Sequence, residues 1–259
     1  MNRSRSIFAA LCCLFVCTLC AMPSSAQTSQ ANEKPPMYSY ISNWQIPRAN
    51  WADMAKENSS EQAILQKALA DGTIVGYGSD ENLVHTPDGE THDSWFSAMS
   101  MAGLMKVLVQ FYASPGSASP VLVSSTKHWD DVMISRYYNW KSGSWKGGYV
   151  WVASYKLKED APHNAVDILS KDVVVPVLEK LLADGTILEY EIDTAAVHTS
   201  APGTFWIVYV APAPEGLDKV DTTILDSLKA SPLSGPAFDS MVDYGAHRDE
   251  LVLGEGTYK

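Results

Sequence analysis

The chain has 259 residues, of which 46% are hydrophobic and 19% are charged, and its formal net charge is −11. This length allows one large hydrophobic core or two modest ones, and an acidic surface repels phosphate backbones and anionic lipid headgroups. We therefore predict neither a nucleic-acid partner nor a peripheral membrane role.

Residues 1–26 have the pattern of a secretory signal peptide. Two arginines precede an apolar run that is short for a bilayer span, and small residues follow up to Ala26. The rival interpretations are an uncleaved membrane anchor and a lipoprotein signal, but neither Cys17 nor Cys20 follows the small residue that a lipoprotein signal has there. We expect cleavage after Ala26, a secreted or periplasmic protein that does not touch the membrane, and a disordered segment at 27–36.

All four cysteines lie inside this leader, at Cys12, Cys13, Cys17 and Cys20. After cleavage the protein has no thiol, so disulfides, cysteine nucleophiles, cysteine-ligated zinc and iron–sulfur clusters are excluded. No phosphate-binding glycine loop, dinucleotide fingerprint or serine-hydrolase elbow is present either. We predict no cofactor.

The rest of the chain contains one unit twice. The stretch "LADGTI" occurs at 69–74 and again at 182–187, and each copy is followed by "VHT" at the same distance. Further on, "ASPGSASP" matches "ASPLSGP", and "HWDDVMI" matches "HRDELVL". We infer an internal duplication into 37–146 and 147–259.

In the first unit, the aromatic and β-branched run "MYSYISNW" predicts a strand, and apolar residues one turn apart in "AILQKALA" predict a helix. Two alternating segments then predict strands that are joined by the turn "PDGE". Leu104, Val107, Leu108 and Phe111 share one face of a second helix, and residues 132–140 form a fourth strand. The predicted order is therefore β-α-β-β-α-β.

The second unit repeats this order, beginning with the strand "YVWVASYKL" and ending with a strand at 251–258. Its first helix contains Pro176, so the helix either begins close to Asp172 or kinks at the proline. In both units an Asp-Gly pair ends that helix, because glycine adopts the left-handed conformation without a Cβ penalty. We interpret Asp71 and Asp184 as turn residues, in preference to catalytic acids.

The doubled β-α-β-β-α-β order is the split βαβ, ferredoxin-like arrangement, and the chain is α+β. It resembles the dimeric α/β-barrel superfamily in a fused form, in which one polypeptide supplies two ferredoxin-like units packed sheet to sheet as a pseudo-dimeric barrel. The resemblance covers nearly the whole of residues 27–259 and concerns the architecture only. It implies a group of proteins that includes cofactor-free monooxygenases, haem-handling enzymes and small-molecule isomerases, so it does not choose a function.

Aromatic residues are abundant on the predicted strands, and about half of them should point into the space between the two sheets. A flat apolar or aromatic ligand would fit there, with Trp44, Trp95, Trp151 and Trp206 as lining residues and Arg136 as a clamp for a carboxylate. The alternatives are an aromatic core without a cavity, and an Arg136 that points outward from an edge strand.

Four histidines form two repeat-related pairs, His85 with His198 and His128 with His247. They are candidate metal ligands if the two units bring them together with carboxylates, although no HExxH spacing exists. The other interpretation is that they satisfy turn backbone groups, and we predict no metal.

The leading hypothesis is a non-catalytic protein that binds a small apolar or aromatic ligand between the sheets. The alternative is an enzyme of the same architecture, namely a cofactor-free monooxygenase or isomerase, or a haem-binding enzyme.

Overall fold

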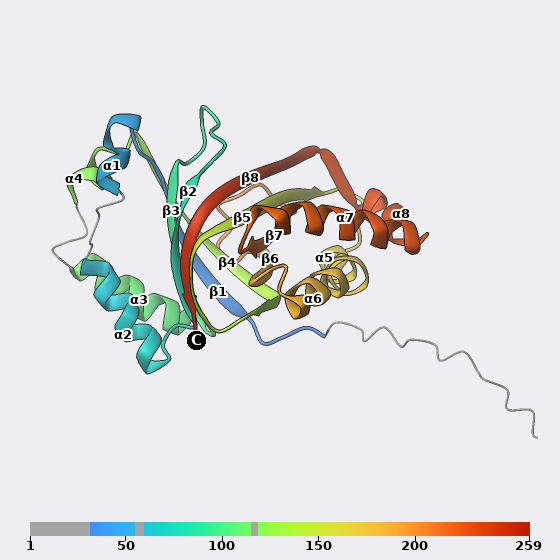
Figure 1. The fold of residues 1–259 in the computed structure, drawn as a ribbon, viewed down its shortest axis with the longest axis horizontal. Helices are drawn as coiled ribbons and strands as arrows, with labels where there is room; N and C mark the ends of the chain where they lie inside the picture. Colours follow the sequence, from blue (N-terminus) through green and yellow to red (C-terminus); the bar gives the residue numbers. More distant parts are fainter. Residues whose placement is uncertain (1–31, 55–59, 115–118) are drawn as a thin grey trace, which may run out of the picture.

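The structure is a computed structural model that describes residues 32–54, 60–114 and 119–259. The predicted signal peptide and residues 27–31 of the segment at 27–36 lie outside the described residues. Eight strands form a closed barrel, and helices cover its outer surface on two opposite sides (Figure 1). The α+β class is confirmed. Within the described ranges, no helix is long and apolar enough to cross a membrane.

Strands occur in the chain as single elements or as consecutive pairs, separated by helices. The eight strands are β1 (Met37–Gln45), β2 (Gly76–Asn82), β3 (His92–Ala98), β4 (Lys127–Trp140), β5 (Gly143–Leu157), β6 (Glu189–Ala195), β7 (Thr204–Ala211) and β8 (Val242–Tyr258). The break between β4 and β5 divides the barrel into a first half, residues 37–140, and a second half, residues 143–258. The predicted boundary between 146 and 147 falls inside β5.

Neighbouring strands around the barrel are all antiparallel, in the order β1-β3-β2-β8-β5-β7-β6-β4. Each half contributes four adjacent strands, and the halves join through the β2–β8 and β4–β6 pairs. Closure leaves no unpaired sheet edge. The space that we expected between two sheets is therefore the interior of one barrel.

The helices lie outside the barrel. In the first half they are α1 (Trp51–Met54), α2 (Ser60–Asp71), α3 (Met101–Ala113) and α4 (Pro120–Val123), with a 3-10 turn at Arg48–Asn50 before α1. In the second half they are α5 (Ala165–Leu169), α6 (Val175–Asp184), α7 (Pro214–Ala230) and α8 (Ser234–Met241). Figure 1 shows α2 and α3 on one side of the barrel and α5 to α8 on the opposite side.

The apolar cores lie between the helices and the outer face of the barrel, because alternate strand residues point outward. The core of the second half contains fourteen buried residues, among them Leu178, Leu181 and Tyr190. The core of the first half contains seven, among them Phe96 and Leu104. The two halves are therefore covered unequally.

The repeated "LADGTI" stretch is the joint between helix and strand that its sequence predicts. Gly72 and Gly185 have φ angles of 78° and 84°, in the left-handed region. Asp71 Oδ1 accepts hydrogen bonds from the backbone N–H of Thr73 at 2.9 Å and from its hydroxyl at 2.6 Å. Asp184 accepts the same pair of bonds from Thr186. The turn interpretation of both aspartates is confirmed.

The helical segment that contains Pro176 begins at Ala165, before Asp172, and includes a π-helical turn. One π-helical turn at Ser170–Val174 separates α5 from α6, and Pro176 lies at the start of α6. Proline has no N–H to donate and its ring clashes with the preceding turn, so a wider turn accommodates it. The sequence predicted either an early helix start or a kink at this proline. The structure has an early start together with a π-helical turn.

Candidate functional site

The interior of the barrel is acidic. A cavity of about 170 Å³ lies inside it. Eight carboxyl groups line this interior cavity, from Asp80, Glu90, Asp93, Asp131, Glu189, Glu191, Asp193 and Glu250. None of the described residues that line it is Lys, Arg or His. This composition differs from the apolar space that we expected between the sheets.

Burial strongly perturbs these carboxyls. Asp80 and Asp93 are direct cross-strand partners on β2 and β3, where like charges repel. Burial raises the pKa of Asp80 to about 7 and raises that of Asp93 well above its usual range. The pKa of Glu250 rises to about 9, chiefly through burial and then through Glu90. These groups retain protons near neutral pH because a buried charge without a counter-ion is costly.

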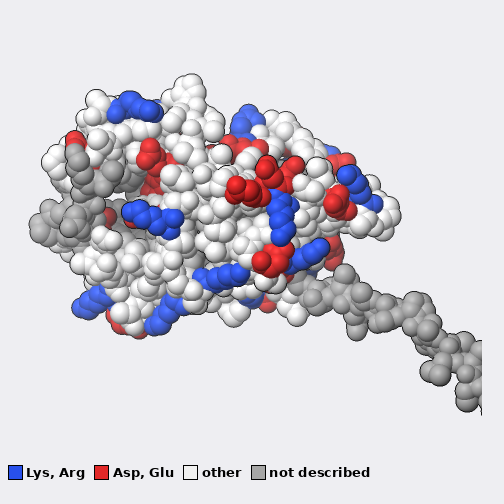
Figure 2. Space-filling model, viewed as in Figure 1, with Lys and Arg blue, Asp and Glu red and all other residues white. Residues whose placement is uncertain are grey.

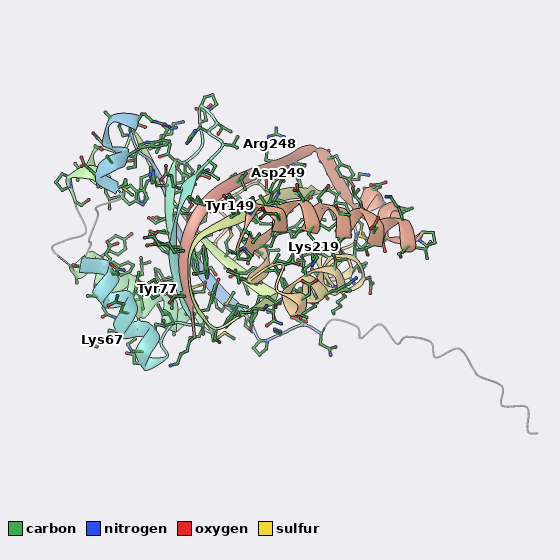
Figure 3. The ribbon with its side chains drawn as sticks, viewed as in Figure 1. Lys67, Tyr77, Tyr149, Lys219, Arg248 and Asp249 are labelled. Atoms are coloured by element: carbon green, nitrogen blue, oxygen red, sulfur yellow. The ribbon has the colours of Figure 1, made fainter. Side chains whose placement is uncertain are left out.

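A second and larger cavity lies outside the barrel, in the first half. It has a volume of about 580 Å³ and lies between the four helices of that half and the strands β1, β2 and β3, with the adjacent ends of β5 and β8 completing its wall. We call it the outer cavity. Aromatic side chains dominate its walls, among them Tyr40, Tyr77, Phe96, Phe111 and Tyr112. Figure 3 shows Tyr77 extending from β2 toward α2 and α3.

One wall of the outer cavity carries a histidine in a defined orientation. The ring of His128, on β4, stacks on Trp44 of β1 with ring centroids 3.7 Å apart. Its Nδ1 lies 3.0 Å from the carbonyl oxygen of Asn43, and its Nε2 lies 3.4 Å from Asp130 Oδ1. Ser42 donates a hydrogen bond to the same carboxylate oxygen. These contacts assign the Nδ1 proton to the Asn43 carbonyl, so Nε2 is the nitrogen that can exchange a proton.

Tyr40 completes this group. Burial raises the pKa of its phenol, and a hydrogen bond to Asp130 raises the pKa further. The phenol therefore stays protonated and is a donor in the cavity wall. Together, Tyr40, Asp130 and His128 place a donor, a carboxylate and an imidazole beside an aromatic space.

The second half repeats this arrangement. His247 stacks on Tyr155 with ring centroids 4.3 Å apart, and its Nδ1 lies 3.0 Å from the carbonyl oxygen of Ser154. Its Nε2 lies 3.0 Å from Asp249 Oδ2. Here Phe238 of α8 packs edge-on against Tyr155 at 5.2 Å, so helix α8 occupies the space that is hollow in the first half.

The tryptophans and the arginine that we predicted as ligand-lining residues lie in different places. Trp95 and Trp206 line the interior cavity, and Trp95 lines the outer cavity as well. Trp44 lines only the outer cavity. Trp151 packs against the apolar core of the second half, parallel to Tyr209.

Arg136 lies at a β-bulge where β4 changes its register against β6. Its guanidinium donates to Glu33 Oε1 at 2.7 Å and is half-exposed. It points toward the N-terminal segment and lines neither cavity.

The four predicted histidines do not meet. His128 and His247 belong to the two separate stacks, and His85 and His198 are exposed on loops. His85 contacts Trp51 at a ring distance of 4.8 Å. Across the described ranges, no three His, Asp or Glu side chains are placed to hold a metal ion.

Sequence reasoning missed the acidic interior. The segment "EYEID" alternates Glu189, Glu191 and Asp193 with Tyr190 and Ile192. A strand of period two turns these three carboxyls toward one face and the apolar pair toward the other. The signal was present, but the acids would have been assigned to solvent, because charged residues are seldom buried.

Comparisons with known proteins support the fold. No protein-family model matches the sequence, and no curated protein matches it. A candidate monooxygenase from Fusobacterium nucleatum subsp. nucleatum ATCC 25586 is similar in structure, with a TM-score of 0.61 at 8% identity over 87% of this chain and 95% of its own. Another candidate monooxygenase, from Lactobacillus acidophilus NCFM, has a TM-score of 0.59 at 12% identity, and the match covers 85% of this chain and 94% of the other.

A chlorite dismutase from Candidatus Nitrospira defluvii is more distant, with a TM-score of 0.48 at 10% identity over 85% of this chain and 90% of its own. The chain thus has the dimeric α/β-barrel fold that its sequence resembles. At these identities the comparisons establish the fold alone, and activity must be argued from the site.

The outer cavity does not suit haem, which the resemblance allows for some members. Among the described residues that line it, His128 is the one histidine. Trp44 covers one face of its ring, and both of its nitrogens already face oxygen atoms. A haem iron needs a free imidazole nitrogen on its axis, so we derive no step through haem.

Proposed function

We propose that the protein is an enzyme of the cofactor-free monooxygenase or isomerase type, which binds a small, flat aromatic substrate in the outer cavity. The observation that carries the proposal is the pair His128–Asp130, held against Trp44 on the wall of an aromatic cavity of about 580 Å³. The equivalent pair His247–Asp249 has helix α8 packed beside it, so the cavity next to His128–Asp130 is what distinguishes the first half.

The chemistry begins with removal of a proton from the substrate. The His128–Asp130 pair accepts this proton, and because His128 Nε2 and Asp130 Oδ1 lie 3.4 Å apart, the two groups hold it between them. The contact with Asn43 fixes the ring orientation. The phenol of Tyr40 donates its one proton to Asp130 and helps to hold that carboxylate in place.

Two reactions follow from the resulting anion. Return of the proton at another carbon gives an isomer. Reaction with dioxygen at a methylene between two rings gives a ketone, in which one oxygen atom enters the substrate and the other leaves as water. That balance needs no external reductant.

The test is turnover of hydroxylated two-ring and three-ring aromatic compounds, measured by oxygen uptake and by mass spectrometry of the products. His128→Asn should lower kcat/KM by roughly 100-fold to 10,000-fold, the usual contribution of a general base. Asp130→Asn should also lower the rate, because the imidazolium loses its partner. Circular dichroism checks that each variant is folded.

His247→Asn is the matched control. It removes an equivalent histidine with equivalent contacts from the half in which α8 fills the space. Its kcat/KM should stay unchanged. Equal losses in both variants would assign the effect to stability, and quenching of Trp fluorescence by a ligand without any turnover would favour a non-catalytic binding protein.

Two further points belong to this proposal. The strand order supports an origin of the barrel in two tandem ferredoxin-like units. Around the barrel the strands of the first half lie in the order β4-β1-β3-β2 and those of the second half in the order β8-β5-β7-β6. In both halves the fourth strand of the half lies beside its first strand, followed by its third and its second. The residue pattern of 1–26 supports export to the periplasm or the exterior. Mass spectrometry of the protein recovered from a periplasmic fraction tests the export.

A further inference from the structure

The acidic interior cavity takes no part in the proposed reaction. Its eight carboxyl groups face one another with no basic side chain among the described lining residues. The surface is different, because Figure 2 shows Lys and Arg interspersed with Asp and Glu over the visible face. The face in Figure 2 therefore lacks the single sign of charge that lines the interior cavity.

Two of these carboxyls have an oxygen atom that receives no hydrogen bond from the backbone or from a hydroxyl, amide or indole group. Asp193 is 4% exposed and Asp80 is 8% exposed. Within the part of the chain that the structure describes, Oδ1 of each is buried in this way; Asp80 has the carboxyl of Asp93 as a hydrogen-bond partner, and both Asp80 and Asp193 line the interior cavity. A buried acceptor without a donor is costly, so these atoms indicate a ligand that brings donors with it.

The walls between the carboxyls define the rest of that ligand. Val150, Val208, Val210 and Val252 contribute aliphatic surface, and the rings of Trp129 and Trp206 also line the space. Aliphatic walls suit methylene groups, and tryptophan faces attract ammonium groups. Because no three described His, Asp or Glu side chains are placed for a metal ion, an organic cation fits this site better than a divalent metal.

The volume limits its size. A cavity of about 170 Å³ equals roughly five to six water volumes at about 30 Å³ each. We propose that the barrel interior is a binding site for a small aliphatic diamine, whose ammonium ends contact the carboxyls around Asp80 and Asp193 and whose methylene chain contacts the valine and tryptophan walls. 1,4-Diaminobutane, with six heavy atoms, has this size and is the probe for the tests.

Binding must displace protons from the site. Burial raises the pKa of Asp80, Asp93, Glu189, Glu191 and Asp193 above their usual ranges, so the site holds protons without a ligand. A bound ammonium favours the ionised carboxylates and lowers these pKa values. Diamine binding should therefore release protons near neutral pH.

The experiment is isothermal titration of the full chain with 1,4-diaminobutane at pH 7.5 in two buffers of different ionisation enthalpy. We expect saturable binding of one diamine with a buffer-dependent heat that reports proton release. At a ligand concentration of about 100 Kd, the Tm should rise by roughly 5–10 °C. Neutral 1,4-butanediol, which has the same number of heavy atoms, should not bind.

Asp193→Asn and Asp80→Asn test the site itself. Each removes one charge at nearly constant shape, so affinity for the diamine should fall by roughly 30-fold. Without ligand the variants should be as stable as the unmodified chain or more so, because one repelling carboxyl is gone. Asp226→Asn removes an exposed charge on α7 and should leave the affinity unchanged.

Four results would overturn the inference. The first is absence of diamine binding to the folded chain, and the second is equal binding of the diol. The third is an equal loss of affinity in Asp226→Asn, which would mean a nonspecific surface effect. Saturable binding of Ca²⁺ or Mg²⁺ in place of the diamine would also overturn it. None of these results bears on the outer cavity, which His128→Asn tests separately.

Discussion

The two halves of the barrel carry the same histidine arrangement in different surroundings. In the first half His128 stacks on Trp44 beside a cavity of about 580 Å³. In the second half His247 stacks on Tyr155, and Phe238 of α8 packs against the same ring. The contacts of the imidazole nitrogens are alike in both halves.

The strands carry the histidine stack in both halves, and the helices differ in how closely they pack against it. In the first half the strand register pairs Trp44 with His128, whereas in the second half Tyr155 and His247 lie at the register shift between β5 and β8. The covering helices then decide whether the stack faces an open space or a packed core. A barrel of two similarly ordered halves can in this way pack one half tightly and leave a cavity in the other.

Core truncation should give the largest difference between the halves. Leu181→Ala, in the packed core of the second half, should lower the free energy of unfolding by about 3 kcal/mol, because it removes a fully buried side chain and leaves a void. Leu108→Ala, on the wall of the outer cavity, should cost about 1 kcal/mol, because that side chain already faces empty space. Urea unfolding of both variants measures the two values.

Similar losses of unfolding free energy in Leu181→Ala and Leu108→Ala would contradict this prediction, since they would mean that the first half is packed as tightly as the second. Leu104→Ala is the control within the first half. This side chain is fully buried and lies away from the cavity lining, so its loss should resemble that of Leu181→Ala.

The pH dependence concerns the interior, to which both halves contribute. Asp80 and Glu250 have folded pKa values of about 7 and about 9, above the ordinary range near 4. The folded state therefore binds their protons more strongly, and stability should fall as pH rises from about 4 to these values. Each such carboxyl contributes up to about 1.4 kcal/mol per pH unit within its own window.

Other groups alter this trend only at its acidic end. Asp184, whose pKa is lowered by hydrogen bonds from Lys219 and Thr186, stays ionised throughout the window. His92, whose pKa is lowered by burial, opposes the trend below about pH 6.5. Thermal unfolding between pH 5 and 9 should show a falling Tm, and the slope should be shallower in Asp80→Asn. A Tm that rises from pH 7 to 9 would contradict the assignment.

The sequence predicted the elements better than the site. Periodicity located the strands and helices of both units, and the turn residues of "LADGTI" gave the helix ends, because both signals are local. Which face of each strand turns inward depends on closure of the barrel, so Trp44 and Trp151 were expected inside and lie outside. The helices α1, α4 and α8 lack a strong apolar period, and they were not predicted.

The smallest expected effects come from substitutions at the repeated turn, where the two halves should lose the same amount of unfolding free energy. Gly72→Ala and Gly185→Ala place a Cβ on residues with φ of 78° and 84°, at a cost of about 1 kcal/mol each. The nearest atom to the new Cβ is a lysine Nζ in both cases, of Lys259 at 3.5 Å and of Lys141 at 3.3 Å, and these flexible chains can move aside. The backbone conformation alone should therefore determine the loss of unfolding free energy. Urea unfolding of Gly72→Ala and Gly185→Ala should give equal losses. Unequal values would show that the repeated turn has different surroundings in the two halves, as the histidine stack does.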